Sequence, residues 1–258
     1  MSVIHSLFSA FLMYSRIPMP QVEWKEENRR YALCFFPLIG CVIGALLLLW
    51  FEISRFLSVH SLLFAAVCTA IPMAVTGGIH LDGFCDVCDA KASCASKERK
   101  LEIMSDSRIG AFAAIHVVLY LLLQTGVFSQ VKDRRLMTVC ALCFVLSRAL
   151  SGLAAVTFRS AKREGALQQF SRPAHRTVTI AAEALILCGC AAAMLCVDSI
   201  AAIGALLGAA LTFLYYRIFS YKTFGGISGD LAGYFLQLCE LAGFFGGTIA
   251  HLIGGSIA

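Results

Sequence analysis

The chain has 258 residues, of which 59% are hydrophobic and only 14% are charged, with a formal net charge of +5 and a mean hydropathy of +0.79. Soluble domains carry roughly 25% charged residues, so this composition excludes an ordinary soluble protein and indicates an integral membrane protein. No nucleic-acid recognition motif accompanies the basic excess, which argues against a nucleic-acid partner.

The chain begins with an apolar segment, Ser2–Tyr14, that is too short to cross a bilayer and lacks the basic start of a signal peptide. We expect a short interfacial helix there. Runs of about 20 apolar residues then predict seven membrane-spanning helices. They are Tyr31–Phe51, Phe56–Thr76, Gly110–Phe128, Leu136–Phe158, Thr177–Val197, Ser199–Phe219 and Leu231–Gly255. The predicted fold is an all-α polytopic membrane bundle, with residues 1–258 as one domain.

Lysine and arginine predict the orientation of the bundle. Sixteen of the 21 lie before the first span or in and beside the loops after the second, fourth and sixth spans. Basic residues are enriched on the cytoplasmic side of membrane proteins. We therefore expect the loops Gly77–Ile109, Arg159–Arg176 and Ser220–Asp230 to share the cytoplasmic face of a bacterial-type inner membrane.

The segment GGIHLDGFCDVCDA, Gly77–Ala90, follows the second span and contains three aspartates. In a helix, Asp82, Asp86 and Asp89 would lie at positions i, i+4 and i+7 and would share one stripe. Like charges at this spacing repel one another, so the stripe indicates a bound cation. Mg²⁺ typically binds one or two carboxylates together with substrate phosphates. The pattern predicts a magnesium site, and nearby His80 is a candidate ligand, base or interfacial polar residue.

Cys85 and Cys88 form a C-x-x-C pattern within the same segment. A structural zinc site needs about four ligands, and no second pair of cysteines or histidines follows nearby. We therefore interpret both cysteines as packing residues. Most of the 12 cysteines lie in apolar runs, where a thiol behaves as a small hydrophobic group, so reduced thiols are expected.

Two further motifs border spans on the same predicted face. Before the third span, Ser105, Asp106 or Ser107 can cap a helix, and Arg108 adds a guanidinium suited to phosphate oxygens. Before the seventh span, GGISGD is a flexible loop that lets backbone approach a ligand closely, or alternatively a simple turn that caps a helix. The candidate binding residues from these two motifs are Arg108, Gly225, Gly226, Ser228, Gly229 and Asp230.

Arg148 lies in the middle of the fourth span, where a charge is costly. It needs either a structural ion-pair partner, for which Glu183 and Glu240 are candidates, or a watery cavity in which it contacts substrate. The sequence leaves both alternatives open.

The motifs TGGIHLDGFCDVCDA, KLEIMSDSRIGAFA and GGISGD, together with SRIPMP, FPLIGCVIG and SRAL, follow in an order that resembles the cobalamin synthase family. These are the adenosylcobinamide-GDP ribazoletransferases. The resemblance implies a magnesium-dependent membrane enzyme of late cobalamin biosynthesis. Such an enzyme joins adenosylcobinamide-GDP to α-ribazole, or its 5′-phosphate, and releases GMP. The family motifs fall here on His80, Asp82, Asp86, Asp89, Asp106, Ser107, Arg108, Gly110, Gly225, Gly226, Ser228, Gly229 and Asp230.

A mechanism follows from this resemblance. The aspartate stripe would hold Mg²⁺ against the pyrophosphate of the donor while a ribose hydroxyl of the acceptor attacks phosphorus. Arg108 and the GGISGD loop would stabilise charge on the phosphates. Asp82 belongs to the predicted catalytic group, and the general base is Asp106, His80 or Asp230, with Asp106 favoured.

Two other classes of function fit part of the pattern. Another magnesium-dependent phosphotransferase or prenyltransferase would also use aspartates, although D-G-F-C-D lacks the arginine of the CDP-alcohol phosphotransferase pattern D-G-x-x-A-R. A cation-coupled transporter would explain charges inside spans. Against a transporter, the acidic and glycine clusters lie at one face and no repeat symmetry is present. The pattern specifies neither the number of ions nor an oligomeric state.

Overall fold

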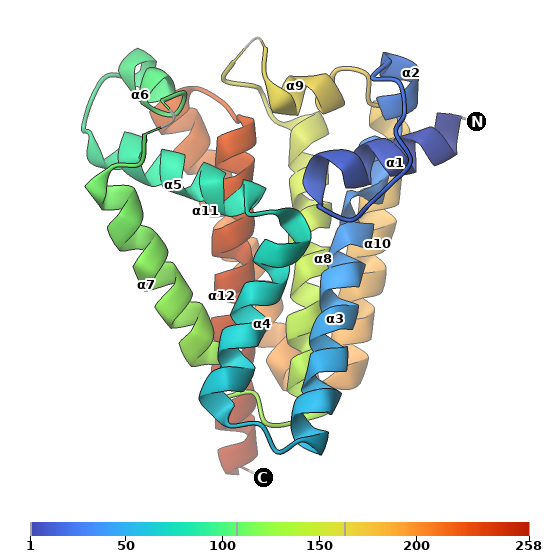
Figure 1. Ribbon diagram of the computed structural model, residues 1–258, viewed down its shortest axis with the longest axis vertical. Helices are drawn as coiled ribbons and strands as arrows, with labels where there is room; N and C mark the ends of the chain where they lie inside the picture. The colour runs from blue at the N-terminus through green and yellow to red at the C-terminus, as the bar shows by residue number, and fades with distance from the viewer. Residues whose placement is uncertain (1, 107, 163, 258) are drawn as a thin grey trace.

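The computed structural model describes residues 2–106, 108–162 and 164–257 and shows a bundle of long helices, upright in Figure 1. The short helices α1, α2, α5, α6 and α9 gather at one end, which we call the loop-rich end. The elements are α1 (Ser2–Tyr14), α2 (Glu26–Arg29), η1 (Ala32–Phe35), α3 (Phe36–Phe56), α4 (Ser61–Thr76), α5 (Ile79–Ala92), α6 (Lys97–Ile103), α7 (Ala111–Phe128), α8 (Arg134–Thr157), α9 (Ala166–Ser171), α10 (Arg176–Val197), α11 (Ser199–Phe224) and α12 (Gly229–Ile257).

The all-α polytopic prediction is confirmed. Within the described ranges, six helical segments are long and apolar enough to cross a membrane, and α4 with α5 passes the same test as a bent pair. Each of the seven predicted spans corresponds to a helix, in order. The first span begins later than expected, at Phe36, because a 3₁₀ turn precedes it and Pro37 favours the first helical turn. Helix α1 forms where the short helix was predicted and lies across the loop-rich end (Figure 1).

The aspartate segment forms a helix that turns away from the span before it. Helix α5 is bent by 97° from α4. Gly77 and Gly78 make this turn with φ angles of 65° and 79°, a left-handed conformation that glycine adopts at little cost. Helix α5 therefore runs across the loop-rich end and does not continue the direction of α4 (Figure 1).

Helices α11 and α12 approach each other closely through glycines. A Cβ atom on Gly246 would overlap the carbonyl oxygen of Gly204, and one on Gly208 would overlap that of Ala242. Small residues at helix interfaces let backbones approach in this way. The contact fixes α12, whose first turn belongs to the site described below.

We expect Gly246→Ala to lower the thermal unfolding temperature of the detergent-solubilised protein. Overpacking costs about 1–3 kcal/mol, which corresponds to roughly 2–12 °C for a chain of this size. Gly189→Ala is the matched control, since a Cβ atom there meets no atom within 4 Å. Equal unfolding temperatures for the two variants would contradict the close contact.

Candidate active site

The aspartate helix α5 and the first turns of α12 lie against each other at two glycines. A Cβ atom on Gly83 would be 2.8 Å from the Cα atom of Asp230, and one on Gly233 would be 2.8 Å from the carbonyl oxygen of His80. Backbone cannot move aside as a flexible side chain can, so any larger residue would separate the helices. The two glycines therefore bring the aspartates of α5 beside Asp230.

Asp82, Asp86 and Asp230 form what we call the acid cluster. Asp82 is exposed, whereas Asp86 and Asp230 are half-buried. Burial raises the pKa of the Asp86 carboxyl to about 7, and the negative charges of Asp82 and Asp230 act in the same direction. A raised carboxyl pKa means that the ionised form is disfavoured there. The two neighbouring carboxylates therefore add to the effect of burial on Asp86, and Lys162 acts in the opposite direction.

Asp89, the third member of the predicted stripe, contacts a helix end. Its Oδ2 accepts a hydrogen bond from the Gly110 N–H at 2.6 Å, and its Oδ1 accepts one from the Ala113 N–H at 2.8 Å. The carboxylate therefore caps α7 from α5, and its charge favours the positive end of that helix. Asp89 as a metal ligand stays a prediction.

We expect Gly110→Ala to destabilise the protein by about 1 kcal/mol, the usual cost of losing a helix cap. A Cβ atom on Gly110 would lie 2.7 Å from Asp89 Oδ2 and would displace the carboxylate. Thermal unfolding measures the effect. Gly126→Ala on the same helix is the control, because its Cβ atom meets nothing within 4 Å. A Gly110→Ala variant as stable as this control would rule out the cap.

The helix cap predicted for the start of the third span differs from the cap in the structure. Asp106 does not cap α7, whose N-cap residue is Gly110, because its carboxylate is occupied by Arg108. Asp106 Oδ2 accepts from Arg108 Nη2 at 2.7 Å, and Oδ1 accepts from its Nε and backbone N–H at 3.1 Å. These hydrogen bonds lower the pKa of Asp106 to about 2, which makes it a weak proton acceptor at neutral pH. Ser107 lies outside the described residues.

The GGISGD loop ends one helix and begins another. Gly225 ends α11 with a φ of 81°. The Ser228 hydroxyl is buried and accepts a hydrogen bond from the Leu231 N–H at 3.2 Å, which caps α12. The predicted capping alternative is therefore present, while Gly229 and Asp230 in the first turn of α12 line a cavity.

The same loop pairs with the segment that follows α8. The Ile227 N–H donates to the Arg159 carbonyl at 2.8 Å, and the Ala161 N–H donates to the Ile227 carbonyl at 2.8 Å. A Cβ atom on Gly226 would overlap the Arg159 carbonyl oxygen. Gly226 thus serves the close pairing of two loops.

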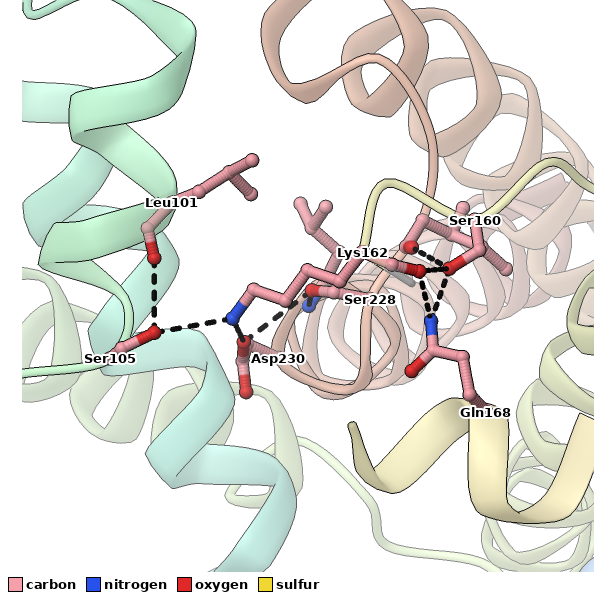
Figure 2. A network of polar contacts seen from close by, with 9 residues as sticks. Leu101, Ser105, Ser160, Lys162, Gln168, Ser228 and Asp230 are labelled. Carbon is pink, nitrogen blue, oxygen red and sulfur yellow. Dashed lines mark hydrogen bonds and ion pairs between the residues drawn. The ribbon is translucent and has the colours of Figure 1, made fainter. Parts of the chain in front are cut away.

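This pairing brings in Lys162, which the sequence analysis did not single out. Its Nζ lies 3.6 Å from Asp230 Oδ2 and 3.4 Å from Ser105 Oγ. Figure 2 shows the side chain extending between these two residues, and the Lys162 carbonyl accepts a hydrogen bond from Gln168 Nε2 at 3.0 Å. An ammonium beside the acid cluster suits a phosphate oxygen. No local pattern marks Lys162, because its position depends on contacts between distant loops.

Arg148 forms the ion pair that the sequence analysis offered as one alternative. Its Nη1 lies 2.7 Å from Glu240 Oε1, and the two side chains are 1% and 2% exposed. Ser147 Oγ donates to the same carboxylate oxygen at 2.9 Å. This geometry supports the structural alternative, whereas contact of Arg148 with substrate stays a prediction.

The residues fit a magnesium site that is completed by substrate. In the described part of the chain, no three His, Cys, Asp or Glu side chains converge closely enough to form a ligand cage. Mg²⁺ usually keeps several waters and takes one or two carboxylates plus phosphate oxygens. The carboxylates of the acid cluster offer hard oxygen donors of the kind that such a site uses.

Cys85 and Cys88 are free thiols, as are the other ten cysteines.

Comparisons with known proteins agree with this combination of motifs. The family model described as cobalamin-5-phosphate synthase matches residues 6–248. A curated relative from Lachnoclostridium phytofermentans, named adenosylcobinamide-GDP ribazoletransferase, is 46% identical over 241 residues, covering 93% of this chain and 92% of its own. One of the same name from Clostridium perfringens strain 13 is 34% identical and covers 90% and 92%. No solved structure matches. The chain therefore belongs to the cobalamin-5-phosphate synthase family.

Proposed function

We propose that this protein is a magnesium-dependent adenosylcobinamide-GDP ribazoletransferase. It joins adenosylcobinamide-GDP to α-ribazole, or its 5′-phosphate, and yields adenosylcobalamin, or its 5′-phosphate, and GMP. The observation that carries this proposal is the contact of α5 with α12 at Gly83 and Gly233, which sets Asp82 and Asp86 beside Asp230. Family membership supports the choice of substrates.

Asp82 and Asp86 of the acid cluster would hold Mg²⁺, which when bound neutralises charge on the donor diphosphate and on the departing phosphate. Lys162, which lies beside Asp230, binds phosphate oxygens as a fixed positive charge. Arg108, whose side chain is 87% exposed at the same end of the bundle, is placed to leave Asp106 for an anionic substrate. These residues orient the diphosphate and stabilise the charge that develops during transfer.

The acceptor contributes the nucleophile. A ribose hydroxyl of α-ribazole forms a bond to the phosphorus that carries cobinamide, and the bond from this phosphorus to the bridging oxygen breaks. GMP leaves with that oxygen. Asp230 takes the hydroxyl proton, because it lines the same cavity as Asp82, whereas Asp106 is not part of that lining. His80 is assigned a different role below.

The proposed location of this chemistry is the cytoplasmic face of a bacterial-type inner membrane. The loop-rich end contains the acid cluster, the GGISGD loop and most of the 21 lysines and arginines. The enrichment of basic residues on the cytoplasmic side supports this orientation. Nucleotide-activated substrates and magnesium are both present in that compartment.

One assay tests the proposal. The purified protein in lipid nanodiscs is given both substrates with and without Mg²⁺, and the products are identified by mass. We expect GMP and the joined corrinoid in equal amounts, and neither without Mg²⁺. Release of CMP or pyrophosphate from other donors would indicate a different transferase. Cation flux in sealed vesicles without chemical conversion would indicate a transporter.

A further inference from the structure

A mainly apolar cavity lies directly beside the acid cluster. It encloses about 110 Å³, and the hollow measures about 680 Å³ with its mouth included. Leu33, Phe36, Leu167 and Leu236 contribute apolar lining, and Asp82 and Asp230 belong to the same lining. A cavity next to reacting groups that presents mostly hydrocarbon is suited to an uncharged, apolar part of a substrate.

The size of the cavity limits how much of an aromatic base it can enclose. A dry apolar cavity of about 150 Å³ in another protein holds a benzene molecule. The enclosed part here, about 110 Å³, is smaller, so it admits at most one ring of an aromatic base, and the rest of the base lies in the mouth. A corrinoid is far too large to enter. Guanine would leave the polar groups around its edge without partners in such a lining, which is costly.

His80 supplies the cavity with one unsatisfied polar atom. The side chain is 5% exposed, and its Nε2 is buried without a hydrogen-bond partner. The imidazole lies near the rings of Tyr14 and Phe36, with ring centroids 6.3 and 5.8 Å away.

A buried polar atom without a hydrogen-bond partner costs about 1–3 kcal/mol, and a ligand atom that pairs with it removes this cost. His80 also borders a second hollow, beside Arg148 and Gln124, but that hollow encloses only about 10 Å³. This space is too small for a ligand. Of the two hollows that His80 borders, the larger cavity is the one with room for a ligand atom.

A second depression meets the cavity at Asp82. This groove encloses about 540 Å³ and is lined by Arg16, Gly77 and Gly78, and it shares Asp82 and Ile79 with the apolar cavity. Asp82 thus lies at the boundary between an apolar hollow and an open groove that contains a guanidinium. The apolar cavity suits an aromatic base, whereas the groove, with its guanidinium, suits an anionic diphosphate.

We propose that the apolar cavity binds the aromatic base of the ribazole acceptor and that the groove receives the anionic donor. The His80 N–H donates to the free ring nitrogen of the base, which is the nitrogen that does not carry the ribose. The ribose then lies at the mouth, with its hydroxyl toward Asp82 and Asp230. His80 is accordingly a positioning residue for the acceptor. This inference rests on the proposed function.

The first test fills the cavity. Ala155 on α8 is buried and lines it without belonging to the acid cluster. We expect Ala155→Leu to weaken binding of α-ribazole to the full-length protein in nanodiscs about tenfold or more, and binding of adenosylcobinamide-GDP less than twofold. Ala155→Gly is the matched control and keeps ribazole binding, because it leaves the space open. Weakened donor binding with unchanged ribazole binding would assign the cavity to guanine and overturn the proposal.

The second test does not use Ala155→Leu and therefore holds even if that variant fails to fold. The wild-type protein should bind α-ribazole about tenfold more tightly than the analogue in which carbon replaces the free ring nitrogen, since one hydrogen bond to a buried donor is lost. His80→Leu should remove this preference. A preference that persists in His80→Leu contradicts the role of His80.

These outcomes distinguish a wrong assignment of the cavity from a wrong proposed function. If the wild-type protein releases GMP and Ala155→Leu leaves the KM for α-ribazole unchanged, the cavity assignment is wrong and the proposed function stands. If the wild-type protein neither binds α-ribazole nor releases GMP, the proposed function is wrong and the cavity assignment is wrong with it.

Discussion

Asp82→Asn is expected to reduce GMP release on the order of 10²–10³-fold, the loss typical when a group that stabilises transition-state charge is removed. Asparagine keeps the shape of aspartate but not its charge, so binding of a divalent cation at the boundary of cavity and groove is weakened. Because Asp82 is exposed, the unfolding temperature should stay at the wild-type value. The measurement is turnover in nanodiscs at saturating substrates and several magnesium concentrations.

Glu98→Gln is the matched control for Asp82→Asn. Glu98 is an exposed acidic residue on α6 at the same end of the bundle, so its substitution changes the net charge by the same amount without touching the acid cluster. We expect wild-type turnover in the control. Wild-type turnover in Asp82→Asn as well would refute the assignment of Asp82 to the metal.

The second large effect is on stability. Glu240→Leu should destabilise the protein by about 3–5 kcal/mol, because it leaves the Arg148 guanidinium buried without its counter-charge. For a chain of this length this corresponds to a fall of roughly 6–20 °C in unfolding temperature. Thermal unfolding of the detergent-solubilised protein, followed by circular dichroism, measures it.

The double variant Arg148→Met with Glu240→Leu distinguishes an unpaired charge from lost packing. Replacing both members of a buried ion pair by apolar residues of similar size is often close to neutral, so the double variant should recover most of the lost stability. A double variant as unstable as Glu240→Leu would show that the loss comes from packing around α12 and not from the charge of Arg148.

The seven spans and the aspartate helix were predictable because each depends on a single stretch of chain. A run of about 20 apolar residues fits a bilayer wherever its neighbours lie, and the spacing of Asp82, Asp86 and Asp89 indicates one helical stripe without any tertiary contact. The need of Arg148 for a partner was also evident from the cost of a charge within a span. The choice of Glu240 over Glu183 was not, because it depends on which faces of α8, α10 and α12 meet.

The rest of the site depends on contacts between distant segments. Asp89 caps a helix that begins 22 residues later in the chain (Asp89 to Ala111), and nothing in the local sequence separates this role from metal binding. Lys162 reaches Asp230 only because Ile227 pairs with the segment after α8. Gly83 and Gly233 are unremarkable in sequence, yet their close contacts decide where the acid cluster forms.

Replacing magnesium with Mn²⁺ and recording its electron–nuclear couplings in the complex with adenosylcobinamide-GDP tests whether the aspartates hold a metal against the donor. We expect a phosphorus coupling from the diphosphate in the wild-type protein and a large loss of Mn²⁺ affinity in Asp82→Asn and Asp86→Asn. Mn²⁺ that binds both variants as tightly as the wild-type protein, or that shows no phosphorus coupling, would contradict this expectation.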